Sequence, residues 1–270
     1  MELSELRKKP HLSASSITTY QDCSLAYFFA YVKHLPMEFV SDALEFGTAI
    51  HLTLADFYRA KMTGDRLLLK DVHASYRQHW TNRVKDRSDI KYAEGKDFQS
   101  YLIEGVDLLS AWFNGLPADS FEVIAVEEAF VTEVDGIPIP LVGAIDLVQQ
   151  DEAGTIIITD HKTTQRAYSI AEIDQNPQLT IYQIAAKAGF RDREILLKFD
   201  CLIKTKAARY EQYYTTRTET DELRLIRKIQ TVWNGIEKGV FIPNDTSWKC
   251  KTCPYKKACD EWFLQQGGNE

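Results

Sequence analysis

Two acidic residues and a lysine stand at the ends of neighbouring apolar segments, where they could act together. The segment GTIIITDHKTT runs from β-branched residues into Asp160, His161 and Lys162, and the earlier segment VGAID ends in Asp146. Alternate residues of a strand share a face, so Asp160 and Lys162 should project together while His161 points away. If the two segments pair as a hairpin, Asp146 reaches the same end of the sheet.

Two carboxylates and an ammonium group in one place suit the hydrolysis of a phosphodiester bond. Mg²⁺ and Mn²⁺ prefer carboxylate oxygens and keep several water molecules. A bound ion of this kind activates water and neutralises charge on a phosphate, and the lysine could orient that water or stabilise the transition state. An isolated D-x-K is more often a simple ion pair at a strand end, so the pattern needs support from the rest of the chain.

The spacing of apolar residues predicts the elements that must position these groups. Short turns, DGIP and DEAG, separate three strands, so we expect an antiparallel meander followed by a helix, two more strands and a long amphipathic helix. The N-terminal half is expected to be helical, with no strand in it. The expected strands cover residues 121–134, 139–150, 155–162, 194–204 and 208–216. The expected helices cover residues 13–35, 44–61, 67–85, 96–114, 176–189 and 220–238.

This order of elements predicts an α/β fold with a mixed central sheet flanked by helices and a helical N-terminal elaboration. We expect one domain over residues 1–270, in which a mainly helical part (12–118) precedes a core (119–239) and a cysteine-containing segment (240–266). A content of 44% hydrophobic residues is ample for a core. No apolar run is long enough for a membrane span and the N-terminus lacks a secretory signal, so we expect a cytoplasmic protein without a membrane partner.

The charge of the chain leaves a nucleic-acid partner open. The net charge is −7, but nucleic-acid binding depends on a local groove of lysine and arginine rather than on total charge. The sequence contains no G-x-x-x-x-G-K-[ST] loop for nucleotide triphosphates, so any unwinding of DNA would need a separate helicase partner.

Four of the five cysteines are candidates for a second metal centre. Cys250, Cys253 and Cys259 are spaced C-x₂-C-x₅-C, close enough to bind one centre, and they need a fourth ligand. Cys201 lies in an apolar strand, where a small buried residue is the better interpretation, whereas Cys23 lies near the other end of the chain. Four thiolates suit an iron–sulfur cluster or a tetrahedral zinc ion, and spacing alone does not separate the two.

The ordered combination of these residues resembles the PD-(D/E)XK nucleases. The resemblance is to RecB-like exonucleases, which include the nuclease domain of AddB and the CRISPR-associated RecB-like exonucleases. The matching motifs are a histidine in FGTAIH (His51), G-x-x-D (Gly143 and Asp146), [D/E]-x-K (Asp160 to Lys162) and Q-x-x-x-Y (Gln178 and Tyr182). The resemblance implies a restriction-endonuclease-like fold over most of the chain.

The resemblance also implies roles for these residues. The candidate ligands for Mg²⁺ or Mn²⁺ are His51, Asp146, Asp160 and, as a further candidate, His161. The candidate catalytic residues are Asp146, Asp160, Lys162, Gln178 and Tyr182. Gln178 and Tyr182 are four residues apart on one helix face, so both could position the substrate or the lysine. Two acids of the preceding strand, Glu127 and Glu128, could support the site, although solvent exposure explains them equally well.

For the cysteines, the resemblance implies a four-iron four-sulfur (4Fe-4S) cluster. The similar nucleases carry one cysteine before the nuclease core and three after it, which here match Cys23, Cys250, Cys253 and Cys259. A structural zinc ion is the alternative. One departure is Ser24, because many of these nucleases have proline directly after the first cysteine. A centre that joins both ends of the chain closes a long loop, so its expected role is structural.

The function implied by the resemblance is that of a metal-dependent DNA nuclease. The first expectation is an exonuclease that prefers single-stranded DNA and works in repair, recombination, phage or CRISPR-related DNA processing, with a helicase, recombination or CRISPR partner. An endonuclease, or an end-trimming subunit of a larger complex, would use the same site. A non-catalytic DNA-binding module that keeps the cluster is a further alternative, and the presence of all four residues His51, Asp146, Asp160 and Lys162 argues against it.

Overall fold

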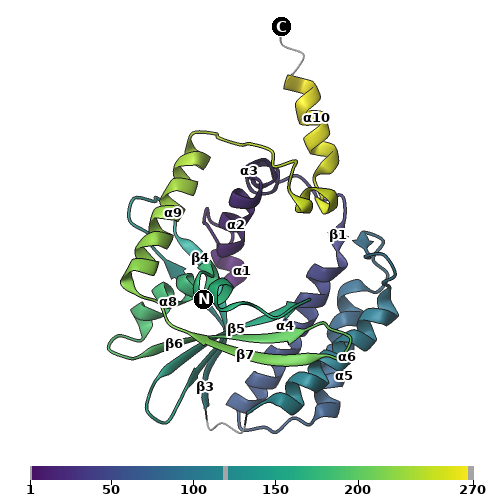
Figure 1. Cartoon of the computed structure of the whole chain (residues 1–270), viewed down its shortest axis with the longest axis vertical. Helices are drawn as coiled ribbons and strands as arrows, with labels where there is room; N and C mark the ends of the chain where they lie inside the picture. The colour runs from purple at the N-terminus through teal and green to yellow at the C-terminus, as the bar shows by residue number, and fades with distance from the viewer. Residues whose placement is uncertain (1, 118–120, 267–270) are drawn as a thin grey trace.

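The computed structural model describes residues 2–117 and 121–266, and a five-stranded sheet lies at its centre (Figure 1). The strands of this sheet are β3 (Glu122–Thr132), β4 (Leu141–Gln150), β5 (Ile156–Thr164), β6 (Ile195–Ile203) and β7 (Arg209–Thr215). The α-helices are α1 (Leu3–Leu6), α2 (Ala14–Asp22), α3 (Ser24–Tyr27), α4 (Asp42–Met62), α5 (Leu69–Val84), α6 (Phe98–Gly115), α7 (Ile170–Asp174), α8 (Pro177–Gly189), α9 (Glu219–Glu237) and α10 (Lys256–Gln266). The predicted mixed α/β class is confirmed. The predicted boundary between residues 118 and 119 lies outside the described residues.

The sheet is mixed, and its strand order follows the chain from β3 to β7. The predicted antiparallel meander is confirmed, because β4 pairs antiparallel with both β3 and β5. Strands β5 and β6 pair in parallel, which requires a crossover connection. Helices α7 and α8 lie in that connection, so α8 packs on the sheet beside the end of β5 that carries the D-x-K motif.

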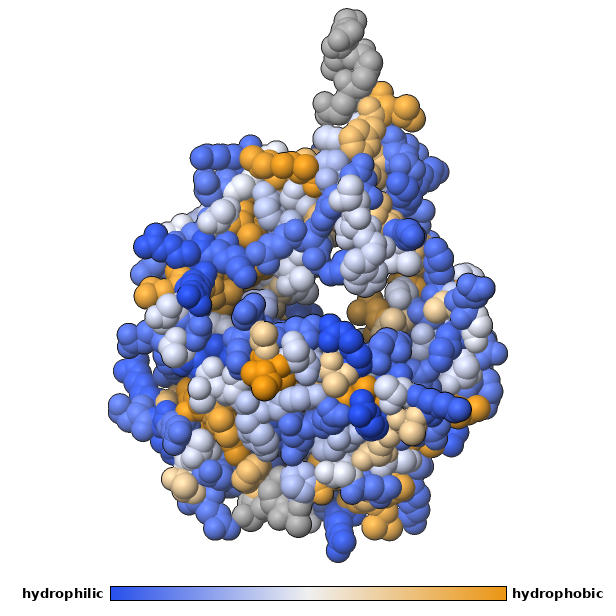
Figure 2. Space-filling view, in the orientation of Figure 1, coloured by the Kyte–Doolittle hydropathy of each residue, from blue (hydrophilic) through white to orange (hydrophobic). Residues whose placement is uncertain are grey.

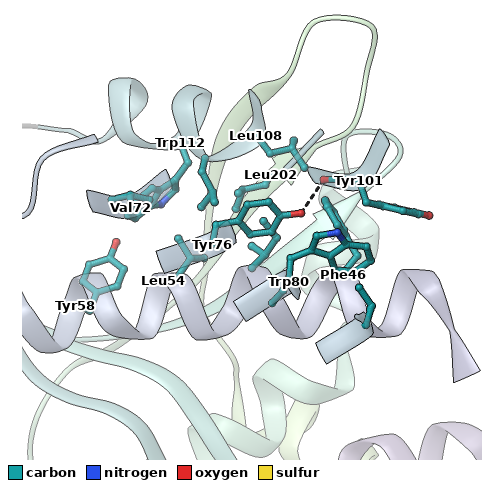
Figure 3. Close-up of a cluster of buried hydrophobic side chains, with 14 of the residues drawn as sticks. Phe46, Leu54, Tyr58, Val72, Tyr76, Trp80, Tyr101, Leu108, Trp112 and Leu202 are labelled. Carbon is teal, nitrogen blue, oxygen red and sulfur yellow. Dashed lines mark hydrogen bonds between the residues drawn. The ribbon is translucent and has the colours of Figure 1, made fainter. Parts of the chain in front are cut away.

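Helices α4, α5 and α6 cover one face of the sheet through an aromatic core (Figure 3). Phe46 and Trp80 are fully buried in it, and the hydroxyl of Tyr76 donates a hydrogen bond of 2.7 Å to the carbonyl of Tyr101. A Cβ atom on Gly105 would lie 2.0 Å from the Tyr76 ring, so only glycine fits there. This packing fixes α4, which carries His51, against the sheet.

The other face of the sheet is covered by α2, α8 and α9. Their shared core includes Ile17 of α2, Ile181 of α8 and Ile229 of α9. Helix α2 begins after Ser13, whose side chain accepts a hydrogen bond of 3.1 Å from the backbone N–H of Ser16, as a serine N-cap does. The two helical layers therefore sandwich the sheet, and each supplies one side of the candidate site.

Two expectations for the N-terminal half are wrong. The helix expected over residues 13–35 is broken at Cys23, whose backbone is extended (φ −163°, ψ 103°) between α2 and α3, and its last part is a π-helix, η1 (Phe28–Val32). Two short strands also occur, β1 (Val40–Ser41) and β2 (Ile90–Lys91), which pair in parallel. Each has two residues, too few for a periodic pattern, and they form because α4 and α5 bring their flanking loops together.

After α9 the chain returns to the N-terminal helices through a short 3₁₀ helix, η2 (Trp248–Thr252). We call residues 20–38 and 240–259 the cap. Hydrogen bonds tie the two parts, from the Tyr20 hydroxyl to the Val240 carbonyl (2.7 Å) and from the Asn244 side chain to the Asp22 carbonyl (2.7 Å). Helix α10 projects from the body, and Figure 2 shows an opening through the molecule between the cap and the sheet.

None of the helices in residues 2–117 and 121–266 combines the length and apolar character that crossing a bilayer requires.

Candidate active site

The candidate site forms where β4 and β5 separate. The last paired residues of β4 and β5 are Leu147 and Thr159. Beyond this pair the strands diverge, and the first unpaired residue is Asp146 on β4 and Asp160 on β5. In place of the strand ladder, the backbone N–H of His161 donates a hydrogen bond of 2.8 Å to the carboxylate of Asp146. The gap between the strands lets side chains from both helical layers reach the two carboxylates.

Three side chains converge at this gap. Donor atoms of His51, Glu127 and Asp146 all lie within 4.8 Å of one another. His51 comes from α4, and its Nδ1 is 3.4 Å from Oδ2 of Asp146. One imidazole and two carboxylates in this space form a candidate site for a divalent cation.

Glu127 reaches the group through an unusual backbone conformation. Val126 pairs with Leu147 and Glu128 with Ile145, so Glu127 stands opposite Asp146 on the neighbouring strand. Its φ is +53°, in the left-handed region that non-glycine residues rarely occupy and that tends to persist at functional sites. Sequence reasoning gave Glu127 only a supporting role. The register opposite Asp146 is the signal that distinguishes it from Glu128.

Lys162 lies beside this group and is held by two partners. Its ammonium forms an ion pair of 2.7 Å with Oδ2 of Asp160 and donates a hydrogen bond of 2.9 Å to Oε1 of Gln178. The amide of Gln178 in turn donates to the hydroxyl of Tyr182 at 2.7 Å. The structure thus joins the D-x-K motif of β5 to both residues of the Q-x-x-x-Y motif of α8.

Burial and mutual repulsion set the charges of the site. Burial raises the pKa of Asp146 well above its usual range, and the nearby charge of Asp160 raises it further. Burial lowers the pKa of His51, against the opposing effect of Asp160. Burial would also lower the pKa of Lys162, but the ion pair with Asp160 outweighs it and the net pKa is raised. His51 is therefore neutral and able to bind a metal, while Lys162 stays protonated.

The residues present fit a divalent metal ion. Asp160 is fully buried, and its Oδ1 atom has no hydrogen-bond partner among the described residues. A buried carboxylate oxygen without a donor is costly unless a cation neutralises it. Asp160 lies outside the 4.8 Å group, but its charge acts on both Asp146 and His51. Asp160 is therefore a further carboxylate that could support an ion held by His51, Glu127 and Asp146.

The ring of His161 points to the α4 side of the sheet, where its centroid lies 6.2 Å from that of His51, and it is not one of the three groups whose ligand atoms converge. Its plane stacks on Tyr58 with the ring centroids 5.7 Å apart, and its Nδ1 is 3.7 Å from Oδ2 of Asp200, which pairs with Lys198 at 3.3 Å. These residues are buried, and burial lowers the pKa of His161 well below its usual value. The backbone of His161, and not its ring, contacts Asp146.

The four cysteines predicted to bind a metal centre line one cavity in the cap, of about 540 Å³, whereas Cys201 is buried in β6. The cavity residues are Cys23, Cys250, Cys253 and Cys259. A tetrahedral zinc ion with Zn–S bonds of about 2.3 Å would hold its sulfur atoms about 3.8 Å apart. Within the described part of the chain, no three cysteine sulfur atoms gather within 4.8 Å. Four thiolates that line one cavity are chemically compatible with either a zinc ion or a 4Fe-4S cluster.

Comparisons with known proteins identify the family of the chain. The sequence profile of the PD-(D/E)XK nuclease superfamily matches residues 11–260. A search of curated proteins found no match. Among solved structures, a candidate exonuclease from Eubacterium rectale superposes with a TM-score of 0.53 at 9% identity, over 90% of this chain and 87% of that chain, which supports the fold alone. The structure of SSO0001 gives a TM-score of 0.36 at 15% identity, over 89% of this chain and 94% of that chain, too low to support an argument.

Proposed function

Because the chain belongs to the PD-(D/E)XK nuclease superfamily, we propose that it is a metal-dependent deoxyribonuclease that acts as an exonuclease on single-stranded DNA. The observation that carries the proposal is the convergence of donor atoms from His51, Glu127 and Asp146 within 4.8 Å of one another, beside the Asp160–Lys162 pair. Two carboxylates, one buried and one half-buried, together with a half-buried imidazole form a set of ligands that suits Mg²⁺ or Mn²⁺.

The chain's own residues have distinct parts in the reaction. A bound divalent ion would supply charge neutralisation at the phosphate and a more acidic water molecule. The ion pair with Asp160 raises the pKa of Lys162 and so favours its ammonium form, which is available to a phosphate oxygen or to the attacking water. Asp160 and Gln178 hold that ammonium in place, and Tyr182 holds Gln178.

The requirement for a free strand end is supported by the shape of the molecule. Figure 2 shows an opening bounded by the cap on one side and by the body with the sheet on the other. A strand with a free end can enter a closed opening directly, whereas a circular strand cannot pass through it. Recombination, repair, phage and CRISPR-related processing all generate such ends, and a helicase partner would supply them from duplex DNA.

We further propose that the cap cysteines hold a 4Fe-4S cluster and not zinc. Cys23, Cys250, Cys253 and Cys259 would hold the cluster, and the choice of a cluster over zinc is supported by the resemblance of these four cysteines to those of the RecB-like exonucleases. The cluster would join the two parts of the cap, which come from opposite ends of the chain. Protein purified without oxygen should be brown and contain iron and acid-labile sulfide; colourless protein that contains zinc would contradict this proposal.

The nuclease proposal is tested with linear and circular single-stranded DNA in the presence of Mn²⁺ or Mg²⁺. We expect degradation of the linear strand, survival of the circle, and loss of activity in Asp160→Ala with an unchanged circular dichroism spectrum. Glu128→Ala, which removes an exposed acid from the same sheet, is the control and should keep its activity. Cleavage of the circle would identify an endonuclease, and an Asp160→Ala variant as active as the wild type would overturn the catalytic assignment.

A further inference from the structure

A cavity of about 560 Å³ lies directly beside the residues that hold Lys162. It is bounded by β3 and β4 below and by the N-terminal ends of α2 and α8, and both Gln178 and Tyr182 line it. Its volume falls in the range of about 300–1,000 Å³ typical of small-ligand sites. The cavity is therefore large enough for one nucleotide next to the reacting phosphate.

The ring of Phe130 forms the floor of the cavity, and the absence of a side chain at Gly143 leaves space for it. Phe130 on β3 pairs with Gly143 on β4, and a Cβ atom on Gly143 would lie 2.6 Å from the Phe130 ring. The ring can lie across the sheet only because residue 143 has no side chain. Tyr182 meets it edge to face, with ring centroids 6.1 Å apart. Phe130 remains partly exposed, so its ring is available to a base or sugar.

The wall of the cavity favours an anion. Arg7 lines it and is the one charged residue among the described residues that do so. The remaining polar wall includes the hydroxyls of Ser15 and Thr18. No acidic residue among the described residues lines the cavity, although the protein as a whole has a net charge of −7.

We propose that this cavity binds the nucleotide adjacent to the scissile phosphodiester, with its base or sugar on Phe130 and its phosphate on Arg7. This inference rests on the proposed function and adds the substrate contacts that position the strand. The two contacts differ in character. Phe130 contributes stacking that every base can make, whereas Arg7 contributes a salt-dependent phosphate contact. Neither contact depends on base sequence, as suits a nuclease that digests strands of any sequence.

The test compares two substrates in which the same kind of bond, a phosphodiester, is hydrolysed, but only one of which is long enough to reach the cavity. Linear single-stranded DNA fills the cavity, whereas methyl 4-nitrophenyl phosphate offers only one phosphodiester to the metal site. For Arg7→Gln and Phe130→Leu we expect KM for DNA to rise about tenfold, in line with the loss of one stacking or phosphate contact. For Arg7→Gln we expect kcat for DNA and hydrolysis of the small substrate to stay unchanged, whereas Phe130→Leu, whose ring contacts Tyr182, is judged by KM for DNA. Lys9→Gln and Val131→Ala, exposed neighbours outside the cavity, should match the wild type in both assays.

A binding measurement separates the phosphate contact from catalysis. With a short fluorescein-labelled oligonucleotide in EDTA, Arg7→Gln should lower the salt dependence of binding by about one phosphate contact, while Lys9→Gln should not. Equal KM values for DNA in the wild type and in both cavity variants would overturn the inference, as would equal losses on both substrates. Failure of the wild-type protein to hydrolyse either substrate would instead refute the proposed function.

Discussion

Replacing Glu127 with glutamine should weaken Mn²⁺ binding and at the same time stabilise the metal-free protein. Glu127 and Asp146 have donor atoms within 4.8 Å, and two carboxylate charges at that distance repel by about 3.5 kcal/mol at an effective dielectric constant of about 20. Burial raises the pKa of both groups, so partial protonation relieves some of this repulsion. We therefore expect the variant to be more stable than the wild type by about 1–2 kcal/mol in EDTA.

The same substitution removes a charged metal ligand, and we expect the affinity for Mn²⁺ to fall about tenfold or more. At a Mn²⁺ concentration of about 100 times the wild-type Kd, binding stabilises the wild type by about 2.7 kcal/mol, and a tenfold weaker site gives about 1.4 kcal/mol. Thermal unfolding with Mn²⁺ and with EDTA measures both increments, at roughly 2–4 °C per kcal/mol for a protein of this size.

The matched control for this prediction is Glu128→Gln. Glu128 is the next residue on β3, and its side chain is exposed. The control should keep the wild-type response to Mn²⁺. If Glu127→Gln showed the same Mn²⁺-dependent rise in melting temperature as the wild type and as Glu128→Gln, the assignment of Glu127 to the metal group would be wrong, and its positive φ would need another explanation.

Three further predictions concern the sheet and its charges. Because the pKa of the Asp146 carboxyl is raised, Mn²⁺ must displace a proton below that pKa, so affinity measured by calorimetry should fall as pH falls. In EDTA the folded state binds that proton more tightly than the unfolded state, so stability should fall as pH rises from the usual carboxyl range through the raised pKa. Gly143→Ala should destabilise the protein by about 1–3 kcal/mol in urea unfolding, because the added methyl group overlaps Phe130; an unchanged midpoint would show that the ring can move. Asp200→Ala should cost about 3–5 kcal/mol because it leaves Lys198 buried without its partner, whereas combining Lys198→Met with Asp200→Leu should recover most of that loss; equal losses in the two proteins would contradict this account.

The sequence determined the elements of the core because their signals are local. Alternating and β-branched residues placed strand β5 at Ile156–Thr164, close to the predicted 155–162, and the Asp-Gly and Ala-Gly turns fixed the antiparallel order of β3, β4 and β5. Strand periodicity also placed Asp160 and Lys162 on one face, where the structure shows them paired. Each of these features depends on residues close together in the chain.

Only the tertiary structure decided which side chains meet at the site. Glu127 and Glu128 are indistinguishable as neighbouring acids, and the left-handed backbone of Glu127 opposite Asp146 selects one of them. The break at Cys23, which separates α2 from α3, occurs where the cap folds back on that segment. The pairing of β1 with β2 likewise follows from the packing of α4 and α5. These contacts join residues far apart in the chain. The spacing of apolar residues within one segment carries no information about such contacts, because they form only when the chain has folded.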